Sequence, residues 1–288
     1  MENSNNKFKE KLIETFVAFD KFCKANDLKY YAAYGTLIGA VRHQGLIPWD
    51  DDIDVYMMRD DYNKFCSLKG KVLGHYGIMD INDENYWLLG LAKFVDKDTT
   101  LWEFKQQRLI IGVYIDVFPL DECDKNKVPE LKRQYDKFSN LVIKAMEVYS
   151  FRSFISPLLK FKIRAFWRQL SSILFKKYRL SYYKQKVFEC INNHIKYKGD
   201  YYVSYDGGYG IGEVVEKSLF SDIVLLPFEG VTIPAPIGYD QYLRGIYGDY
   251  MKLPPEGKRV SIHGRYYLNL EKRLSFNEIE KIKNKKLH

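Results

Sequence analysis

The chain has 288 residues, with 45 Lys and Arg against 37 Asp and Glu, a formal net charge of +8 and 46% hydrophobic residues. This hydrophobicity excludes an intrinsically disordered chain, and the composition excludes collagen-like and disulfide-scaffold proteins. The length suits one large domain, or one domain with an insertion. The positive charge alone fits nucleic acid, anionic lipid or a phosphorylated substrate as a partner, or solubility and nothing more.

The four cysteines lie far apart without a C-x-x-C pair, which argues against a cysteine zinc site and a disulfide framework. We expect reduced thiols. No apolar run follows the N-terminal residues, and no stretch of about 18 apolar residues occurs, so neither a signal peptide nor a transmembrane helix is predicted. The expected location is the cytoplasm, with peripheral contact at the inner face of the cytoplasmic membrane left open.

The first elements alternate between helix and strand. Apolar residues at helical spacing predict an amphipathic helix over residues 7–26. Residues 30–33 are apolar and strand-like. The segment 35–41 follows, in which two glycines permit a tight turn into a short helix.

Further strands are predicted at residues 53–58, 91–95 and 109–118. Asp60 stands where it could cap a helix that runs to Ser67. The alternation over the first 120 residues predicts an α/β (α+β) fold, a mixed sheet with flanking helices.

The middle of the chain, about residues 128–195, reads as helical and basic. Residues 151–190 hold ten Lys and Arg against one acidic residue, with Phe, Trp and Leu interleaved. A basic amphipathic helix with aromatic residues is typical of a membrane-surface helix, and we expect residues 151–180 to contact anionic lipid. A core-packed helix with a solvated basic face is the alternative. Short Tyr- and Gly-rich elements and a lysine-rich helix complete the chain.

Four aspartates lie within five residues, at positions 50, 51, 52 and 54, between apolar neighbours. On a strand Asp50, Asp52 and Asp54 would share one face, while Ile53 and Val55 point into a core. Carboxylates on one face suit Mg²⁺ or Mn²⁺. An exposed acidic loop is the alternative. A calcium EF-hand is excluded, because its glycine and glutamate positions are not matched.

A further candidate is Asp116, which is a single carboxylate among the apolar residues from Ile111 to Phe118. Burying an unpaired carboxylate is costly, and the cost falls if it joins a cation. A strand beside that of Asp52 and Asp54 would complete a three-carboxylate site. The alternative is an aspartate that caps a turn at a strand end.

Upstream, Tyr34, Gly35 and Thr36 would end a strand and open a helix, where N–H groups and a hydroxyl can bind phosphate. Such a turn alone is unspecific. A Gly-Thr turn followed about fifteen residues later by Asp-x-Asp is the layout of the nucleotidyltransferase superfamily, in which the carboxylates hold a phosphate-bridging metal.

The segment from Tyr34 to Asp54 resembles the signature of the LicD family, phosphocholine transferases of bacterial surface glycans with fukutin-type proteins as distant relatives. Later blocks match in order: Asp61-Tyr62, Ile115 to Asp121, Phe228-Glu229-Gly230, Ile233-Pro234, Tyr239 to Leu243, Tyr247 to Met251, Pro254-Pro255 and Arg259 with His263. The resemblance covers roughly residues 8–265, without a matched motif in the middle helical region.

The resemblance implies one catalytic domain over residues 1–288, with a nucleotidyltransferase-like fold and a helical basic insertion at about 128–195. It implies transfer of phosphocholine from CDP-choline, or a related CDP-alcohol, to a sugar hydroxyl of a glycan or lipid-linked glycan. Asp52, Asp54 and Asp116 would be the metal ligands and catalytic residues. Gly35 and Thr36 would meet the donor phosphates, beside Asp50.

Basic residues add weaker candidates for phosphate binding: Arg42, His43, Lys93, Arg259 and His263. For each, a structural or solvated role is the alternative. Tyr30, Tyr31 and Tyr34 could contribute to an aromatic pocket for a quaternary ammonium group.

Other activities remain open at this point. The same fold could transfer a nucleotidyl group or another phospho-alcohol. A nucleic-acid-binding protein would use the basic stretch, but it would leave the aspartates unexplained and no recognised motif supports it, so no nucleic-acid partner is expected.

Overall fold

The computed structural model describes residues 2–72, 74–83, 90–104, 109–146, 162–174, 176–261 and 264–285. The helices of the described chain are α1 (Glu2–Ala25), α2 (Tyr34–His43), α3 (Arg59–Ser67), α4 (Val128–Met146), α6 (Ile163–Leu174), α7 (Lys176–His194), α8 (Tyr239–Tyr247) and α9 (Phe276–Lys285). The strands are β1 (Tyr31–Ala32), β2 (Asp54–Met58), β3 (Tyr76–Met79), β4 (Ala92–Asp96), β5 (Thr100–Trp102), β6 (Tyr114–Cys123), β7 (Tyr201–Val203), β8 (Val215–Glu216), β9 (Ile223–Phe228), β10 (Val231–Pro236) and β11 (Tyr267–Asn269).

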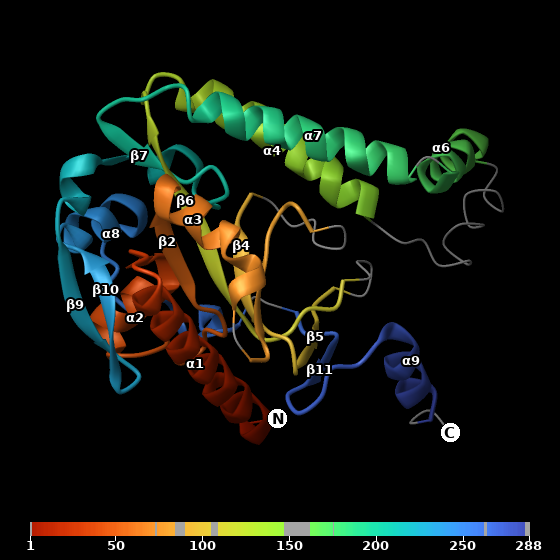
Figure 1. Ribbon diagram of the computed structural model, residues 1–288, viewed down its shortest axis with the longest axis horizontal. Helices are drawn as coiled ribbons and strands as arrows, with labels where there is room; N and C mark the ends of the chain where they lie inside the picture. Colours follow the sequence, from red (N-terminus) through yellow and green to blue (C-terminus); the bar gives the residue numbers. More distant parts are fainter. Residues whose placement is uncertain are drawn as a thin grey trace.

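A mixed sheet organises the molecule, with strand order β1-β2-β6-β4-β3 and with β7 joining the far part of β6 to β8. Only β2 and β6 run parallel among these pairs; the other neighbours in this sheet are antiparallel. Helices α1 and α3 lie against the sheet (Figure 1). The α/β (α+β) class with flanking helices is therefore confirmed.

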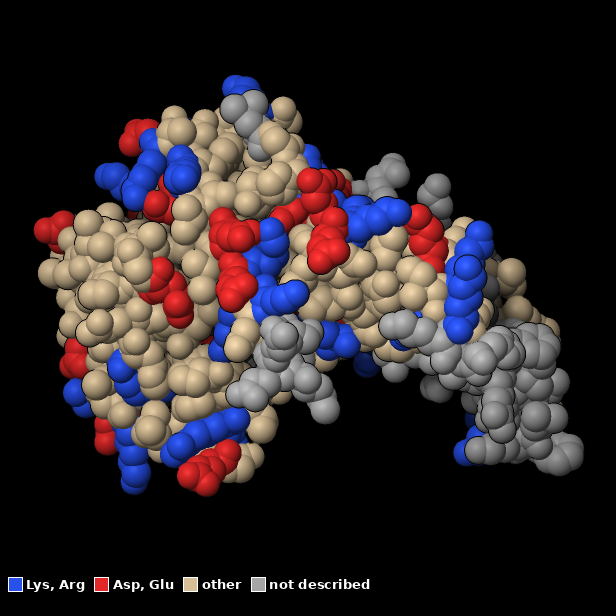
Figure 2. All heavy atoms as spheres, turned by 90° about the horizontal axis from the view of Figure 1, so that it is seen from below, with Lys and Arg blue, Asp and Glu red and all other residues tan. Residues whose placement is uncertain are grey.

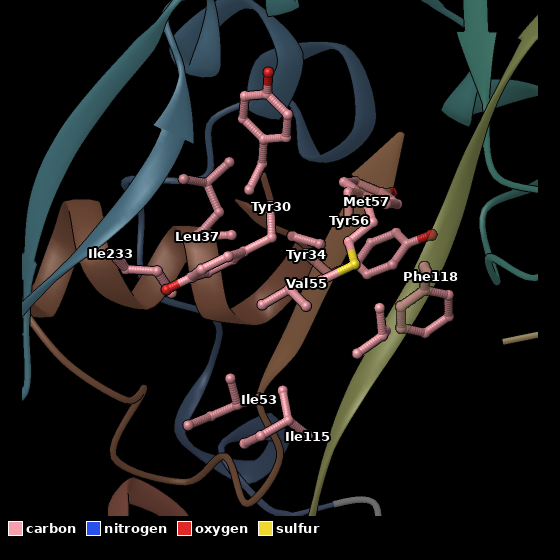
Figure 3. Close-up of a cluster of buried hydrophobic side chains, with 14 of the residues drawn as sticks. Tyr30, Tyr34, Leu37, Ile53, Val55, Tyr56, Met57, Ile115, Phe118 and Ile233 are labelled. Atoms are coloured by element: carbon pink, nitrogen blue, oxygen red, sulfur yellow. The ribbon is translucent and has the colours of Figure 1, made fainter. Parts of the chain in front are cut away.

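The core lies between the sheet, α1, α2 and the β9–β10 hairpin. Side chains of β2 and β6 pack with Leu37 of α2 and Ile233 of β10 (Figure 3). Phe16 and Phe19 of α1 are fully buried against the same cluster. Burying a side chain of this size stabilises the fold by about 1.5–3 kcal/mol, which fixes β2 and β6 at the centre of the domain.

Several predicted boundaries need correction. Asp60 does not cap α3: Met58 is the N-cap residue, no side chain caps this helix, and Asp60 lies in its first turn. The predicted strand at 109–118 is displaced, because β6 spans Tyr114–Cys123 and Ile111 makes only an isolated bridge with Leu101. Residues 50–53 precede β2 instead of belonging to a strand.

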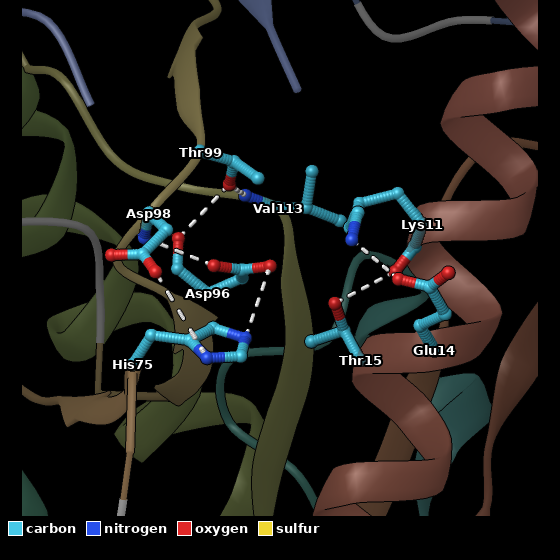
Figure 4. Close-up of polar contacts among 8 residues, drawn as sticks. All are labelled: Lys11, Glu14, Thr15, His75, Asp96, Asp98, Thr99 and Val113. Atoms are coloured by element: carbon cyan, nitrogen blue, oxygen red, sulfur yellow. Dashed lines mark hydrogen bonds and ion pairs between the residues drawn. The ribbon is translucent and has the colours of Figure 1, made fainter. Parts of the chain in front are cut away.

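A hydrogen-bonded turn fixes the start of β6 against the end of β4. Thr99 Oγ1 donates to the Asp96 carbonyl at 2.9 Å and accepts the Val113 N–H at 2.8 Å (Figure 4). A Cβ on Gly112 would stand 1.7 Å from the Asp96 carbonyl oxygen, so only glycine fits there. This turn holds β4 and β6 in register.

Helices α4 and α7 pack side by side, and α6 stands away from the sheet (Figure 1). The described part of the predicted helical region is therefore helical over 128–146, 163–174 and 176–194; residues 147–161 and 175 lie outside the described residues. No described helix has both the length and the apolarity needed to cross a membrane. On the face shown in Figure 2, basic and acidic side chains are interspersed over the body of the molecule.

Candidate functional site

The parallel pairing of β2 with β6 places two of the predicted carboxylates side by side. Asp54 and Asp116 are partners in the strand register, at the first residue of β2 and the third of β6. Both line a cavity of about 400 Å³, together with Asp50 and Asp52. The sheet thus gathers four aspartates from two distant segments around one hollow.

The alternation predicted for the aspartate cluster holds although residues 50–53 are not a strand. Asp50, Asp52 and Asp54 line the cavity, whereas Asp51 points away, with Oδ2 at 3.1 Å from Arg265 Nη2. Ile53 is fully buried in the core. Asp51 therefore has its own basic partner, whereas the other three aspartates of the cluster face the cavity.

Negative charge accumulates at this point. Burial, followed by the charges of Asp52, Asp116 and Asp50, raises the pKa of Asp54 well above its usual value, and Lys93 opposes the rise. Like charges this close destabilise the ionised form unless a cation offsets them. The arrangement is electrostatically unfavourable for stability, which is typical of a functional site.

Lys93 lies on β4 directly opposite Asp116 in the antiparallel register. It is buried, its Nζ bonds Asp116 Oδ1, and it stands 3.4 Å from the centroid of the Tyr114 ring. The prediction that an inward lysine needs an anion is met by a carboxylate of the chain itself. Contact of Lys93 with a phosphate stays a prediction.

The Gly-Thr turn supports the aspartates directly. Gly35 lines the cavity, and a Cβ there would stand 2.6 Å from Asp50 Oδ2, so the glycine makes room for this carboxylate. Thr36 is buried, and its Oγ1 accepts the Asp54 backbone N–H at 2.8 Å. The hydroxyl thus positions Asp54; its predicted contact with phosphate stays a prediction.

Another part of the cavity lining comes from residues for which the sequence indicated no individual role, although Tyr247 lies in one of the LicD-like blocks. Asp206, Gly208 and Tyr209 follow β7, and Tyr247 ends α8; all four line the cavity. Behind them Glu213 is 2% exposed, accepts the Tyr34 hydroxyl, and accepts the Tyr209 N–H at 2.6 Å. The run Tyr205-Asp206-Gly207-Gly208-Tyr209, a carboxylate beside a glycine pair, was the signal available in the sequence.

Comparison with known proteins addresses the identity of the domain. Residues 27–169 match the family model described as LicD/FKTN/FKRP, nucleotidyltransferase domain. The chain is 28% identical over 256 residues to the lipopolysaccharide cholinephosphotransferase LicD of Haemophilus influenzae, covering 85% of this chain and 90% of that protein. The chain belongs to the LicD family.

Shorter matches extend to uncharacterized proteins. One from Rickettsia typhi is 33% identical over 121 residues, which is 41% of this chain and 36% of that protein. One from Rickettsia prowazekii is 58% identical over 36 residues, 12% of this chain and 14% of that protein. The LicD resemblance seen in the sequence is thereby confirmed.

Among the remaining basic candidates of this LicD-family chain, Arg42, His43 and Arg259 do not line the cavity. Arg42 Nη1 donates to the Tyr250 carbonyl at 2.6 Å and its Nε to His43 Nε2 at 2.9 Å. Arg259 Nε donates to the Pro254 carbonyl at 2.8 Å, with the guanidinium 5.8 Å from the Trp49 ring centroid. His263 lies outside the described residues.

The fit of a divalent cation depends on the carboxylates. Within the described ranges, no three Asp, Glu, His or Cys side chains are grouped so that they could hold a metal ion as they stand. The donors themselves are the oxygen ligands that Mg²⁺ prefers, and burial together with the charges of Asp52, Asp116 and Asp50 raises the pKa of Asp54. The LicD cavity therefore has the chemistry for a cation, and binding requires the aspartate side chains to converge.

Proposed function

We propose that this chain transfers phosphocholine from CDP-choline to a sugar hydroxyl of a cell-surface glycan, such as lipopolysaccharide, teichoic acid or capsule. The observation that carries the proposal is the in-register pair Asp54 and Asp116, with Asp50 and Asp52 on the same cavity. The similarity to the lipopolysaccharide cholinephosphotransferase over 90% of that protein's length supports phosphocholine as the transferred group and lipopolysaccharide as the acceptor.

The proposal includes a Mg²⁺ or Mn²⁺ ion held by Asp52, Asp54 and Asp116. When bound, such an ion neutralises charge on the diphosphate of the donor. The chain itself supplies the positions: Thr36 fixes the backbone of Asp54 and Lys93 fixes Asp116.

The transfer step follows from the same residues. The acceptor oxygen attacks the phosphorus of the choline phosphate in line, the bond from that phosphorus to the CMP oxygen breaks, and CMP leaves. Asp116 takes the proton of the acceptor hydroxyl, which becomes acidic as the new bond forms. Lys93 then remains beside a neutral carboxyl.

Product analysis tests the proposal. The full chain is incubated with CDP-choline, Mg²⁺ and candidate glycans, and products are identified by mass spectrometry. Release of CMP with a phosphocholine added to the sugar is the expected result. Transfer of a glycerol or ribitol phosphate from the matching CDP-alcohol, or of a nucleotidyl group, would identify the alternatives on the same cavity. No turnover of CDP-choline by a folded protein would overturn the proposal.

We further propose that α6 and α7 bring the enzyme to anionic membranes that carry the glycan acceptor. Large apolar side chains are exposed along these helices: Ile163, Trp167, Leu174, Tyr178 and Tyr182. The surrounding sequence is strongly basic, with a net charge of +9 over residues 151–190. Exposed apolar and basic side chains on one helix match the interface of an anionic bilayer.

Flotation with vesicles of anionic and of neutral lipid tests membrane contact. The chain should float with anionic vesicles at low salt and be released as salt rises, because the attraction is screened. A Trp167→Glu variant should float less, whereas Tyr197→Glu, a change at an exposed tyrosine after α7, should float normally. Absence of flotation at low salt would remove this part of the proposal.

A further inference from the structure

Four aromatic rings follow one another along the wall of the cavity. The Tyr34 ring lies 5.2 Å from Phe118, edge to face, and 5.8 Å from Tyr209, and the Tyr209 ring lies 5.0 Å from Tyr247 (centroid distances). All four residues line the same hollow as the aspartates. They come from α2, β6, the segment after β7, and α8, so separate parts of the chain converge on this wall.

Two carboxylates stand with these rings. Glu213 accepts the Tyr34 hydroxyl and the Tyr209 N–H, and Asp206 accepts the Gly90 N–H at 2.7 Å and the Tyr135 hydroxyl. These donors are neutral, and among the described residues the structure shows no ion pair to either acid. The aromatic wall thus has two buried carboxyl groups beside it, and neither forms an ion pair among the described residues.

The closeness of Glu213 is built into the backbone. A Cβ on Gly207 would stand 1.7 Å from Glu213 Oε2, so glycine at this position allows the carboxylate to reach the wall. Glu213 is 2% exposed, although burying a carboxylate costs free energy. A carboxylate buried at such a cost, next to tyrosine rings that line a cavity, indicates a site for a cation in that cavity.

The shape of the wall favours one kind of cation. The hydrogen-bonding groups of Glu213 and Tyr34 are already used by each other, whereas the half-exposed Tyr209 ring lines the cavity. A quaternary ammonium group has no N–H to donate and binds through its charge and methyl surface to aromatic faces. A primary ammonium would lose the hydrogen bonds that it makes to water and regain few of them here.

We propose that Tyr34, Phe118, Tyr209 and Tyr247, with Glu213 and Asp206 beside them, form the subsite for the trimethylammonium group of the donor. This deepens the proposed function and rests on it. The diphosphate end then meets the aspartates of the same cavity, while the alcohol end meets the rings. The wall is therefore what distinguishes choline from smaller phospho-alcohols.

Tyr209 gives the sharpest test, because it is 50% exposed and its substitution leaves the core intact. CMP release is measured with CDP-choline and with CDP-ethanolamine as donors. Tyr209→Leu should raise KM for CDP-choline about tenfold and abolish the preference for it over CDP-ethanolamine. Tyr209→Phe keeps the ring and should restore the preference. Tyr197→Leu, at an exposed tyrosine away from the cavity, should behave as the wild type. A Tyr209→Leu enzyme that still prefers CDP-choline would overturn the subsite while leaving the transfer activity standing.

Direct binding separates the two proposals. Choline and its uncharged isostere 3,3-dimethyl-1-butanol are each added to the wild type and to Tyr209→Leu, and contact is followed by saturation-transfer NMR. Choline should contact the wild type alone, and the isostere neither protein. If choline contacts only the wild type but CDP-choline is not turned over, the proposed function is wrong and the quaternary ammonium site is supported. Equal signals from choline and the isostere, or no choline signal in the wild type, would overturn the subsite.

Discussion

Strand β6 carries Asp116 toward its start and Asp121 toward its end, and the charged surroundings of these two carboxylates differ. Asp121 is 2% exposed and forms a two-point ion pair with Arg59, at 2.6 Å from Nε to Oδ1 and 2.7 Å from Nη2 to Oδ2. Asp116, five residues earlier, faces a cavity with three further aspartates and has Lys93 as a basic partner. One end of the strand is balanced in charge, and the other carries an excess.

The contrast separates a structural acid from a functional one within the same strand. A planar guanidinium matches a carboxylate at two points and satisfies both oxygens, which leaves nothing for a ligand to do. At the Asp116 end the charges of Asp52, Asp116 and Asp50 act together on Asp54 and Lys93 opposes them, so a cation would offset repulsion between like charges there. Substitution of the cavity aspartates should therefore reduce turnover, whereas substitution of Asp121 should reduce the free energy of unfolding.

The largest expected effect is on turnover. Asp54→Asn should reduce CMP release by about 10³-fold, since charge neutralisation by a held cation contributes several kcal/mol. The same change should raise the free energy of unfolding at pH 8, because it removes a carboxylate whose pKa the fold raises. Steady-state kinetics and urea unfolding measure the two effects.

Asp98→Asn, at an exposed aspartate after β4, is the matched control and should alter neither. An Asp54→Asn protein that keeps full turnover would contradict the assignment of the carboxylates. Loss of both turnover and stability would instead place Asp54 with the structural acids.

The other end of β6 should show the reverse. Asp121→Asn leaves the Arg59 guanidinium partly buried without its charge partner, and it should lower the free energy of unfolding by about 3 kcal/mol. Urea unfolding measures the loss, and KM for the donor in the remaining folded protein should stay near that of the wild type. Asp60→Asn, an exposed acid in the first turn of α3, serves as control. A stable Asp121→Asn protein would show that the ion pair contributes little.

Glu213 predicts a pH effect of intermediate size. Burial raises the pKa of Glu213 from 4.5 to about 7, so the folded chain holds a proton that the unfolded chain releases. The native state binds more protons between about pH 4.5 and 7, and stability from this group falls as pH rises through that window. Relative to Glu213→Gln, the wild type should lose on the order of 2 kcal/mol between pH 4.5 and 8.

Urea midpoints of both proteins at several pH values measure this difference. Glu216→Gln, at an exposed glutamate on β8, should follow the wild type at every pH. A difference between wild type and Glu213→Gln that stays constant with pH would contradict the raised pKa.

The smallest effect concerns the contact that positions Asp54. Thr36→Val keeps the shape of the side chain and removes the acceptor of the Asp54 N–H. The unfolding free energy should fall by about 1 kcal/mol, and turnover should fall severalfold as Asp54 loses its fixed position. Thr232→Val, on the exposed face of β10, should change neither quantity. Unchanged turnover in Thr36→Val would show that Asp54 is positioned by the strand alone.

Much of the aspartate side of the cavity was predictable from local patterns. Asp50, Asp52 and Asp54 share a face because chain neighbours in an extended segment alternate, even though β2 begins only at Asp54. Asp116 could be proposed as their companion because it is isolated among apolar residues. Its register with Asp54 could not, since pairing between distant strands depends on tertiary packing.

The aromatic side was not predictable in the same way. Tyr30 and Tyr31 were considered with Tyr34 for a cation pocket, but both are buried elsewhere, with the Tyr30 hydroxyl on Asp20 and the Tyr31 ring against Phe220. Among 24 tyrosines, composition alone does not indicate which line a cavity. The convergence of Tyr209 and Tyr247 with Tyr34 depends on contacts across more than 170 residues of chain.

The parallel pairing of β2 and β6 also affects how fast the protein folds. Asp54 and Asp116 are separated by a long stretch of chain that includes α3, β3, β4 and β5, and a direct hairpin cannot join them. Contacts of such sequence separation form slowly, because the closure of a long loop precedes any gain from pairing. Helical structure should therefore form early during refolding, and catalytic activity should return late. The rate at which activity returns then reports the rate at which the central sheet forms.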